Sequence, residues 1–235
     1  MTQGHGFRFH GLWLVARPSG ALWWPEGRWL MVADLHLGRS ERMARRGGSL
    51  LPPYEGRATL ERLGAEIAAL DPATVASLGD GFDDLAAAEA IAPDLAGLLA
   101  GLARGRDWVW IAGNHDPGAP GAPGRLPGRA LDALRLGEVT LRHIASPGAG
   151  PDISGHFHPA LRLAGERRRA FVLGEAHLVL PAFGTYTGGL ACDHPDLRRV
   201  VPHGLALVCA GRILPVPLGH GTASAPARRR LPGLR

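Results

Sequence analysis

The stretch DWVWIAGNHD, residues 107–116, joins a short apolar run to a group of polar side chains. Residues 108–111 combine aromatic and β-branched side chains, and a run of this length and composition predicts a buried strand. The polar residues follow at the carboxyl end of that strand. Asn114 is the only asparagine among 235 residues, but its rarity shows little because the whole composition is biased. Its position at a strand end is the informative feature.

Apolar runs of this kind alternate with helical patterns on both sides of the stretch. Residues 59–70 place apolar side chains at helical spacing, and residues 83–103 predict a helix interrupted near Pro93. Residues 116–128, rich in Gly and Pro, predict a loop. This order implies a layered α/β core in one domain, with no linker before about residue 218. We expect strands at residues 7–16, 21–25, 28–34, 74–80, 107–113, 138–143, 152–156, 170–183 and 204–218, the first two forming a hairpin around a Pro18-Ser19-Gly20 turn.

The positive charge is concentrated at the C-terminal end. All 26 basic residues are Arg, against 21 acidic residues, and the formal net charge is +5. Residues 218–235 carry four arginines and no acid, so the remaining chain is almost neutral, with 22 basic and 21 acidic side chains. We expect residues 218–235 to form a flexible basic tail. An electrostatic arm for nucleic acid is the alternative.

The sequence also bounds the compartment. No apolar run approaches the ~18 residues needed to cross a bilayer, and the N-terminal residues lack the pattern of an export signal. Cys192 and Cys209 are isolated, which is typical of free thiols in a reducing compartment. We therefore expect a cytoplasmic protein with no membrane partner.

Polar residues occur at the ends of five predicted strands. In open α/β sheets ligands bind at the edge where the strands end, so side chains from separate strands can meet there. Any one of these blocks alone is more often a loop or a hydrogen-bonded histidine than a metal site. Their common placement is what indicates a shared site. The eight residues are Asp34, His36, Asp80, Asn114, His115, His143, His156 and His158.

These blocks resemble a known set of motifs. The segments DLHLG (34–38), GDGFD (79–83), GNHD (113–116) and GHFH (155–158), with His143 between the last two, are similar to the five ordered motifs of the calcineurin-like metallophosphoesterase superfamily. Within it, RRGGSLLPPYEGRATL (45–60) and LPAFGTYTGGL (180–190) resemble the bacterial ligase-associated DNA damage response endonucleases, a likeness that spans nearly residues 1–215. The chain departs from that family at Asp83 (histidine expected), Gly38-Arg39 (Glu-Lys expected) and Glu55-Gly56 (Asp-Thr expected).

The resemblance implies a fold and a metal centre. The expected fold is a layered α/β/β/α sandwich of two mixed sheets flanked by helices, formed by residues 1–217 as a single catalytic domain. Two divalent ions would bind, most simply Mn²⁺, with Fe or Zn as alternatives that suit the same imidazole and carboxylate ligands. The implied ligands are Asp34, His36 and His158 for one ion and Asn114, His143 and His156 for the other, with Asp80 bridging.

The resemblance also implies a mechanism. A hydroxide shared by the two ions would attack phosphorus in line, and His115 would protonate the leaving oxygen as the general acid. Asp116 is expected to orient the His115 ring. Asn114 supplies a neutral oxygen ligand that does not repel the phosphate. Arg39, Tyr54 and Tyr186 are candidate substrate contacts, although both tyrosines also fit a purely structural role as turn residues.

Three functions are compatible with these residues. The first is a nuclease acting on DNA in repair, in functional association with a DNA ligase and a helicase. The second is a phosphodiesterase or phosphatase for nucleotides or other small phosphate esters, since the metal centre binds phosphate and not base. The third is a non-catalytic scaffold of the same fold, which would have no need for a full ligand set and His115. The absence of an insertion that could cap the site favours a polymeric substrate.

Overall fold

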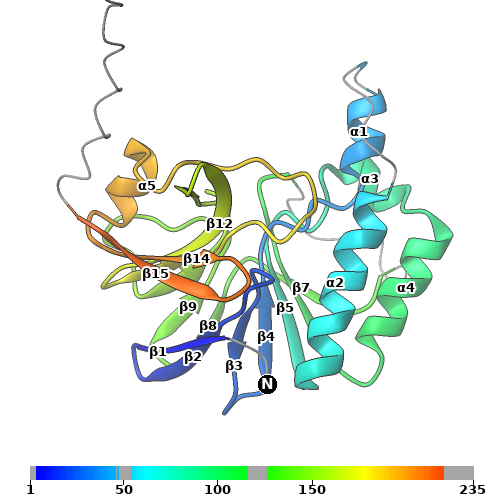
Figure 1. Cartoon of the computed structure of the whole chain (residues 1–235). Coiled ribbons are helices and arrows are strands. Elements are labelled where there is room, and N and C mark those ends of the chain that lie inside the picture. Colours follow the sequence, from blue (N-terminus) through cyan, green and yellow to red (C-terminus); the bar gives the residue numbers. More distant parts are fainter. Residues whose placement is uncertain (1–3, 46, 48–53, 116–125, 220–235) are drawn as a thin grey trace, which may run out of the picture.

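The computed structural model describes residues 4–45, 47, 54–115 and 126–219. Two mixed β-sheets pack face to face, and helices cover their outer faces (Figure 1). The first sheet has the same order in space as in the chain. Its antiparallel half is β1 (His5–Phe9), β2 (Leu12–Ala16), β3 (Leu22–Trp24) and β4 (Trp29–Val32), and its parallel half continues from β4 through β5 (Thr74–Leu78), β6 (Asp107–Ile111) and β7 (Arg129–Leu131).

The second sheet is formed by the C-terminal half of the chain. Its order is β15 (Ile213–Leu218), β14 (Gly204–Cys209), β12 (Glu166–Leu173), β13 (His177–Val179), β10 (Asp152–Ser154), β9 (Val139–Leu141) and β8 (Leu134–Leu136). Strand β11 (Ala160–Leu163) pairs with β12 as a hairpin. β10 is parallel to both of its neighbours, β9 and β13. The ends of β9 and β10 therefore lie at one edge of this sheet.

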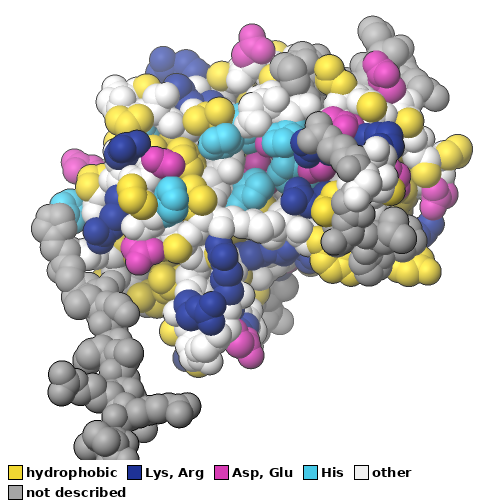
Figure 2. All heavy atoms as spheres, turned by 90° about the horizontal axis from the view of Figure 1, so that it is seen from above, with side chains coloured by type: hydrophobic (Ala, Val, Ile, Leu, Met, Phe, Trp, Pro, Cys, Tyr) yellow, Lys and Arg dark blue, Asp and Glu magenta, His cyan; other side chains and the backbone are white. Residues whose placement is uncertain are grey.

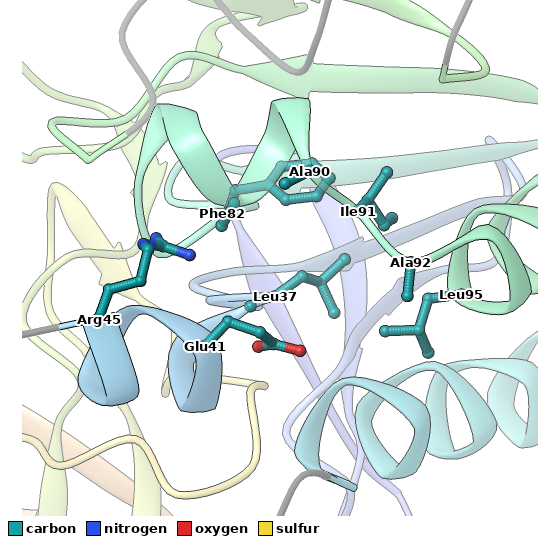
Figure 3. Close-up of a pocket in the computed structure, with 10 residues that line it drawn as sticks. Leu37, Glu41, Arg45, Phe82, Ala90, Ile91, Ala92 and Leu95 are labelled. Carbon is teal, nitrogen blue, oxygen red and sulfur yellow. The ribbon is translucent and has the colours of Figure 1, made fainter.

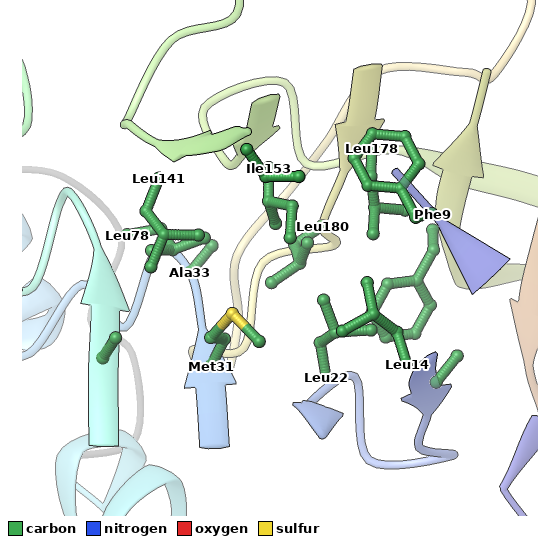
Figure 4. Packing of buried hydrophobic residues seen from close by; sticks show 14 of the residues in the cluster. Phe9, Leu14, Leu22, Met31, Ala33, Leu78, Leu141, Ile153, Leu178 and Leu180 are labelled. Atoms are coloured by element: carbon green, nitrogen blue, oxygen red, sulfur yellow. The ribbon is translucent and has the colours of Figure 1, made fainter. Parts of the chain in front are cut away.

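Three buried clusters account for the four layers. Between the sheets, side chains such as Phe9, Leu14, Met31 and Leu178 interdigitate (Figure 4). Successive residues of each strand point to opposite faces, so Leu30 and its neighbours on the outer face pack against the helices. The helices on the first sheet include α2 (Glu55–Leu70) and α4 (Pro93–Ala103), and α5 (Pro195–Val200) packs on the second sheet. The expected α/β/β/α sandwich is confirmed.

The helices begin and end where local chemistry requires it. α2 ends at Asp71, which is in the left-handed conformation, and Pro72 follows. The helical pattern at 83–103 is divided, as expected, into α3 (Leu85–Glu89) and α4, because Pro93 occupies the first turn of α4. The side chain of Asp84 caps α3 by accepting a hydrogen bond from the backbone N–H of Ala87 (2.8 Å).

The expectations of one strand over residues 170–183 and of one over 204–218 were wrong, because each run forms an antiparallel pair, β12–β13 and β14–β15. The expectation of one strand over residues 7–16 was also wrong. The chain reverses at His10 and Gly11, both of which have positive φ, and forms the hairpin β1–β2. The β2–β3 reversal around Pro18–Gly20 was predicted correctly. β7, β8, β11, α1 (Arg39–Arg45) and α5 were not predicted, because each is short and lacks a clear period. Most of the 116–128 loop lies outside the described residues, as does nearly all of 218–235.

Neither cysteine shows a feature of a reactive thiol. Cys192 and Cys209 are buried and free, and burial raises the pKa of each to about 12. Among the described residues, no helix is both long enough and apolar enough to cross a membrane.

Candidate metal centre

The candidate centre lies where strand ends of the two sheets meet. The chain leaves β4, β5 and β6 at the carboxyl edge of the first sheet, while β9 and β10 end beside them in the second. The segment after β13 joins the two edges, because Phe183 and Gly184 donate backbone hydrogen bonds to the carbonyls of Ala33 and Asp34. Histidine side chains gather in the middle of this face (Figure 2).

Asp34, His36 and His158 form the first group of potential metal ligands. One ligand atom from each lies within 4.8 Å of the others. His158 Nε2 is 3.2 Å from Asp34 Oδ1 and 3.4 Å from His36 Nε2. Asp34 is fully buried and also accepts hydrogen bonds from the backbone N–H of His156. The group therefore combines residues from both sheets.

Asp80, His143 and His156 form the second group, again with ligand atoms within 4.8 Å of one another. Asn114 joins it, since its Oδ1 is 2.9 Å from His143 Nε2. His143 Nδ1 is 3.0 Å from the carbonyl oxygen of Leu78, which can only accept. The ring therefore donates from Nδ1, and Nε2 is the nitrogen that faces Asn114 and Asp80.

Asp80 lies between the two groups. Its Oδ2 is 3.4 Å from His143 Nε2 and 3.9 Å from His36 Nε2, while Oδ1 accepts the backbone N–H of His115 at 2.9 Å. Burial on its own raises the pKa of Asp80. The contacts with His143, His115 and His36 outweigh it and lower the pKa to about 2. This carboxylate therefore stays ionised and is directed toward both groups.

The donor set fits divalent cations. His143 Nδ1 donates to the Leu78 carbonyl, so Nε2 is the ring nitrogen that faces the oxygens of Asn114 and Asp80. A metal ion held between these atoms would take the place of a proton on Nε2. The neighbouring carboxylates raise the pKa of His143 against the opposing effect of burial, whereas burial and the nearby His143 lower the pKa of His156. Imidazole, carboxylate and amide ligands without thiolate suit Mn, Fe or Zn.

The backbone at the site is unusual. Ten described non-glycine residues have positive φ, and five of them belong to the two groups: Asp34, His36, Asp80, His156 and His158. Residues other than glycine rarely adopt a positive φ, and where they do, contacts with the surrounding structure hold the backbone in that conformation. At Gly79 a Cβ atom would lie 2.2 Å from His143 Nδ1, and at Gly155 it would lie 2.6 Å from Asp34 Oδ2. Glycine allows the two sheets to approach this closely.

A solved structure is similar to this chain over most of its length. The crystal structure of Pseudomonas putida nuclease MPE aligns with a TM-score of 0.72 and 30% identity, covering 91% of this chain and 100% of that one. The chain belongs to the same family as this nuclease. No protein-family model matches the chain, and no curated protein matches it either.

His115, the family's expected acid, lies beside the first group. Its ring meets the ring of His36 edge-on, with centroids 5.3 Å apart. His115 Nδ1 is 3.0 Å from the carbonyl oxygen of Asp83, so that nitrogen donates and Nε2 remains for another partner. Asp116, predicted to orient His115, lies outside the described residues. Among the described residues, the backbone carbonyl of Asp83 is the group that orients the His115 ring through Nδ1.

Asp83 contacts a potential metal ligand. The sequence analysis noted this residue only because the family motif has histidine at this position. Its buried carboxylate contacts His36 Nδ1 (2.8 Å), Arg39 Nη1 (3.1 Å) and Arg42 Nη1 (2.9 Å). Burial opposes ionisation, but His36 and both arginines hold the pKa of Asp83 well below its usual range. Asp83 thus links helix α1 to a metal-binding candidate. Nothing in the spacing of Arg42 pointed to this role.

The three candidate substrate contacts lie in different surroundings. Arg39 is tied to Asp83, next to His36. Tyr54 precedes α2 and is 69% exposed, and Tyr186 is 49% exposed in the loop after Gly184. Neither tyrosine belongs to the two groups of potential ligands. Their roles in substrate binding stay predictions.

A mainly apolar pocket of about 140 Å³, with Glu41 and Arg45 among its lining residues, lies beside the loops that carry the potential ligands. Leu37 and Phe82, which follow the ligands His36 and Asp80, form an isolated β-bridge and line this pocket with Ile91 and Leu95 (Figure 3). None of the potential metal ligands lines it. It is therefore distinct from the two groups of potential ligands.

Proposed function

We propose that this protein is a dinuclear metal-dependent phosphodiesterase that acts as a nuclease on DNA. The observation that carries the proposal is the pair of ligand groups with Asp80 between them, in a chain of the same family as a nuclease. Asp34, His36 and His158 would hold one ion and Asn114, His143 and His156 the other, and Asp80, which lies between the two groups, would serve both. Mn²⁺ is the proposed metal. Bound there, the ions supply a nucleophile at neutral pH and neutralise charge on the phosphoryl group.

The protein's own residues prepare the site for that reaction. The carbonyl of Leu78 fixes the His143 tautomer, and the backbone N–H of His115 holds one oxygen of Asp80. Asn114 contributes an oxygen without charge, which limits repulsion of an anionic substrate. These groups orient the ligands before substrate arrives.

His115 is the proposed general acid. Its Nδ1 proton is committed to the carbonyl of Asp83, so Nε2 is the nitrogen that protonates the departing oxygen. Such a donor is most important when the leaving group is a poor one, as the sugar oxygen of DNA is. We extend the proposal to a role in DNA repair, in functional association with a ligase and a helicase. This extension rests on the resemblance of residues 45–60 and 180–190 to the ligase-associated DNA damage response endonucleases.

The test is a substrate screen with the Mn²⁺-loaded protein. Single-stranded, nicked and duplex DNA are compared with bis-p-nitrophenyl phosphate and cyclic nucleotides, and His115→Ala serves as the control for contaminating nucleases. We expect wild-type protein to cleave DNA and His115→Ala to lose that cleavage. Hydrolysis of small esters without DNA cleavage would replace the nuclease proposal with a small-molecule phosphodiesterase. No hydrolysis of any substrate by metal-loaded protein would indicate a scaffold.

A further inference from the structure

An arginine-lined pocket adjoins the candidate metal centre. It has a volume of about 220 Å³ and is lined by His158 together with the consecutive Arg167, Arg168 and Arg169 of β12. The remaining lining side chains are small, among them Thr187. His158 belongs to the first ligand group, so the pocket and the metal centre share a wall. Arginine side chains lie on the same face as the histidines (Figure 2).

The positive charge in this pocket is only partly balanced. Arg168 pairs with Glu166, but no described carboxylate lies within ion-pair distance of Arg167 or Arg169. Arg169 donates to the carbonyl of Gly184 (2.5 Å), and Arg167 donates to that of Gly189. A guanidinium carries five N–H donors, so most of them remain for a ligand.

Two further arginines increase the local charge. Arg62 donates to the carbonyl of Phe183, stacks on that ring at 4.5 Å, and lies close enough to Arg169 for their repulsion to lower its pKa, after the larger effect of burial. Arg162 lies directly opposite Arg167 in the β11–β12 hairpin. Like charges in such positions are destabilising, so the fold gains nothing from this charge itself.

We infer that this pocket binds a phosphate of the DNA strand next to the phosphodiester being cleaved. The inference rests on the proposed function. It adds the path that the DNA strand takes away from the metal centre. Guanidinium groups pair with phosphate through two parallel hydrogen bonds, and phosphate supplies the negative charge that the pocket lacks. A small phosphodiester occupies the metal centre alone, whereas a polynucleotide also reaches Arg167 and Arg169.

The opposite side of the centre is built differently. The pocket there, about 410 Å³, is lined by Asn114, His143, Asp132 and Arg142. Arg142 Nε lies 3.5 Å from the buried carboxylate of Asp152, and Asp132 adds a negative charge to the rim. Its charge is therefore balanced. This asymmetry assigns the neighbouring phosphate to the side of His158.

A structural role for the arginines must be separated from phosphate binding, because both residues hold the loop after Phe183 through backbone carbonyls. Arg167→Gln and Arg169→Gln keep an N–H donor for the carbonyl and remove the charge. Arg167→Lys keeps the charge. Arg104→Gln is the matched control, since Arg104 is exposed at the end of α4, before β6 begins, whereas the site residues follow the end of β6.

Two measurements test the inference. The first is binding of a fluorescent single-stranded oligonucleotide in EDTA over a range of salt concentrations. We expect each Gln variant to bind the oligonucleotide about tenfold more weakly, because one charged hydrogen bond is lost. The slope of the logarithm of the binding constant against the logarithm of the salt concentration should fall by about 0.7. Arg167→Lys keeps the salt slope of wild type but binds more weakly, because an ammonium group cannot form the two parallel hydrogen bonds. Arg104→Gln matches wild type. The second is kcat/KM with Mn²⁺, which falls for DNA but not for bis-p-nitrophenyl phosphate.

The outcomes distinguish the two proposals. Wild-type binding by both Gln variants, or equal losses on DNA and the small ester, would overturn the phosphate pocket and leave the nuclease proposal standing. Wild-type protein that binds DNA through Arg167 and Arg169 but never cleaves it would overturn the nuclease proposal and leave the pocket standing. Thermal melting of each variant shows whether the loop after Phe183 has been disturbed.

Discussion

The two edges of the parallel half of the first sheet carry charge in opposite ways. At the amino edge, Asp71 pairs with Arg28 (2.7 Å) and Asp107 pairs with Arg129 (2.9 Å), all exposed to water. At the carboxyl edge, Asp34 and Asp80 are buried, and their ion-pair partners among the described residues are histidines and no arginine. The amino-edge carboxylates are neutralised by arginines, whereas Asp34 and Asp80, unlike Asp83 at the same edge, have no arginine partner among the described residues.

This difference separates stability from function. An exposed ion pair contributes little to folding because water screens it. Asp80 stays ionised although it is buried, because histidines and a backbone N–H surround it, and perturbed groups of this kind occur most often at functional sites. The left-handed backbone of Asp34 and Asp80 costs free energy. The backbone conformation at the carboxyl edge therefore lowers the stability of the metal-free protein. Binding of metal should raise the melting temperature.

The largest effect is expected from Asp80→Asn. Asn tolerates the left-handed backbone of this position, but a neutral amide cannot serve two cations as a carboxylate does. We expect fewer than two Mn²⁺ ions per chain and hydrolysis reduced by more than the ~10–100-fold that loss of a supporting group costs. Metal analysis of the dialysed protein and bis-p-nitrophenyl phosphate hydrolysis measure both. Unchanged occupancy by two ions would remove Asp80 from the bridging role.

His115→Ala should remove catalysis and keep the metals. Loss of a general acid costs about 10²–10⁴-fold when the leaving group is poor. The loss should be much smaller for bis-p-nitrophenyl phosphate, because p-nitrophenolate departs without a proton. Rates on DNA and on this ester, with metal content as the control, test the role directly. Equal losses on the two substrates would exclude His115 as the acid.

Gly79→Ala tests how closely the two sheets must approach. Its new Cβ atom would meet His143 Nδ1 at 2.2 Å, and its φ is +81°. The matched control is Gly137→Ala, with φ +62° and no atom within 4 Å of the added Cβ. The control carries only the backbone cost of about 1 kcal/mol, whereas Gly79→Ala adds the overpacking cost of ~1–3 kcal/mol and displaces His143. Urea unfolding and metal content measure the two effects, and identical behaviour of the variants would contradict the predicted clash.

Asp83→Asn should weaken the link between α1 and His36. The folded pKa of Asp83 lies below its unfolded value, so its stabilisation is fully present above the unfolded pKa of about 3.9 and is lost as pH falls through the folded pKa. The free-energy difference between wild type and Asp83→Asn, about 3 kcal/mol at pH 7 for a broken buried pair, should shrink below about pH 4. Urea unfolding of EDTA-treated protein at pH 7, 5 and 3 measures it. A difference that is constant with pH would mean that the charge of Asp83 is not what matters.

The sequence predicted the parts of this site that follow strand ends. Asp34, His36, Asp80, Asn114, His115, His143, His156 and His158 all sit directly after strands, so their convergence follows from parallel order and from the resemblance. Their individual roles remain predictions.

The interactions that were missed depend on how separate elements pack. Asp83 contacts Arg39 and Arg42 only because α1 presents one particular side to the loop after β5, and nothing in the spacing determines that side. Arg167, Arg168 and Arg169 precede the strand expected from residue 170, and only the packing of β12 places them beside His158. The turn at His10-Gly11 was missed because apolar residues continue on both sides of it.

The smallest effect is expected at the amino edge. Asp71 shares with Asp80 the left-handed backbone, with φ of 44° and 45°, but Asp71 is 77% exposed and Asp80 is buried. Asp71→Asn therefore removes one carboxylate charge on the same backbone conformation as Asp80→Asn. We expect a change in unfolding free energy below about 1 kcal/mol, with metal content and hydrolysis at wild-type levels. A loss of metal in Asp71→Asn would mean that any carboxylate at a sheet edge supports the centre. Equal effects of the two substitutions on the stability of metal-free protein would mean that the buried charge of Asp80 affects folding no more than the exposed charge of Asp71.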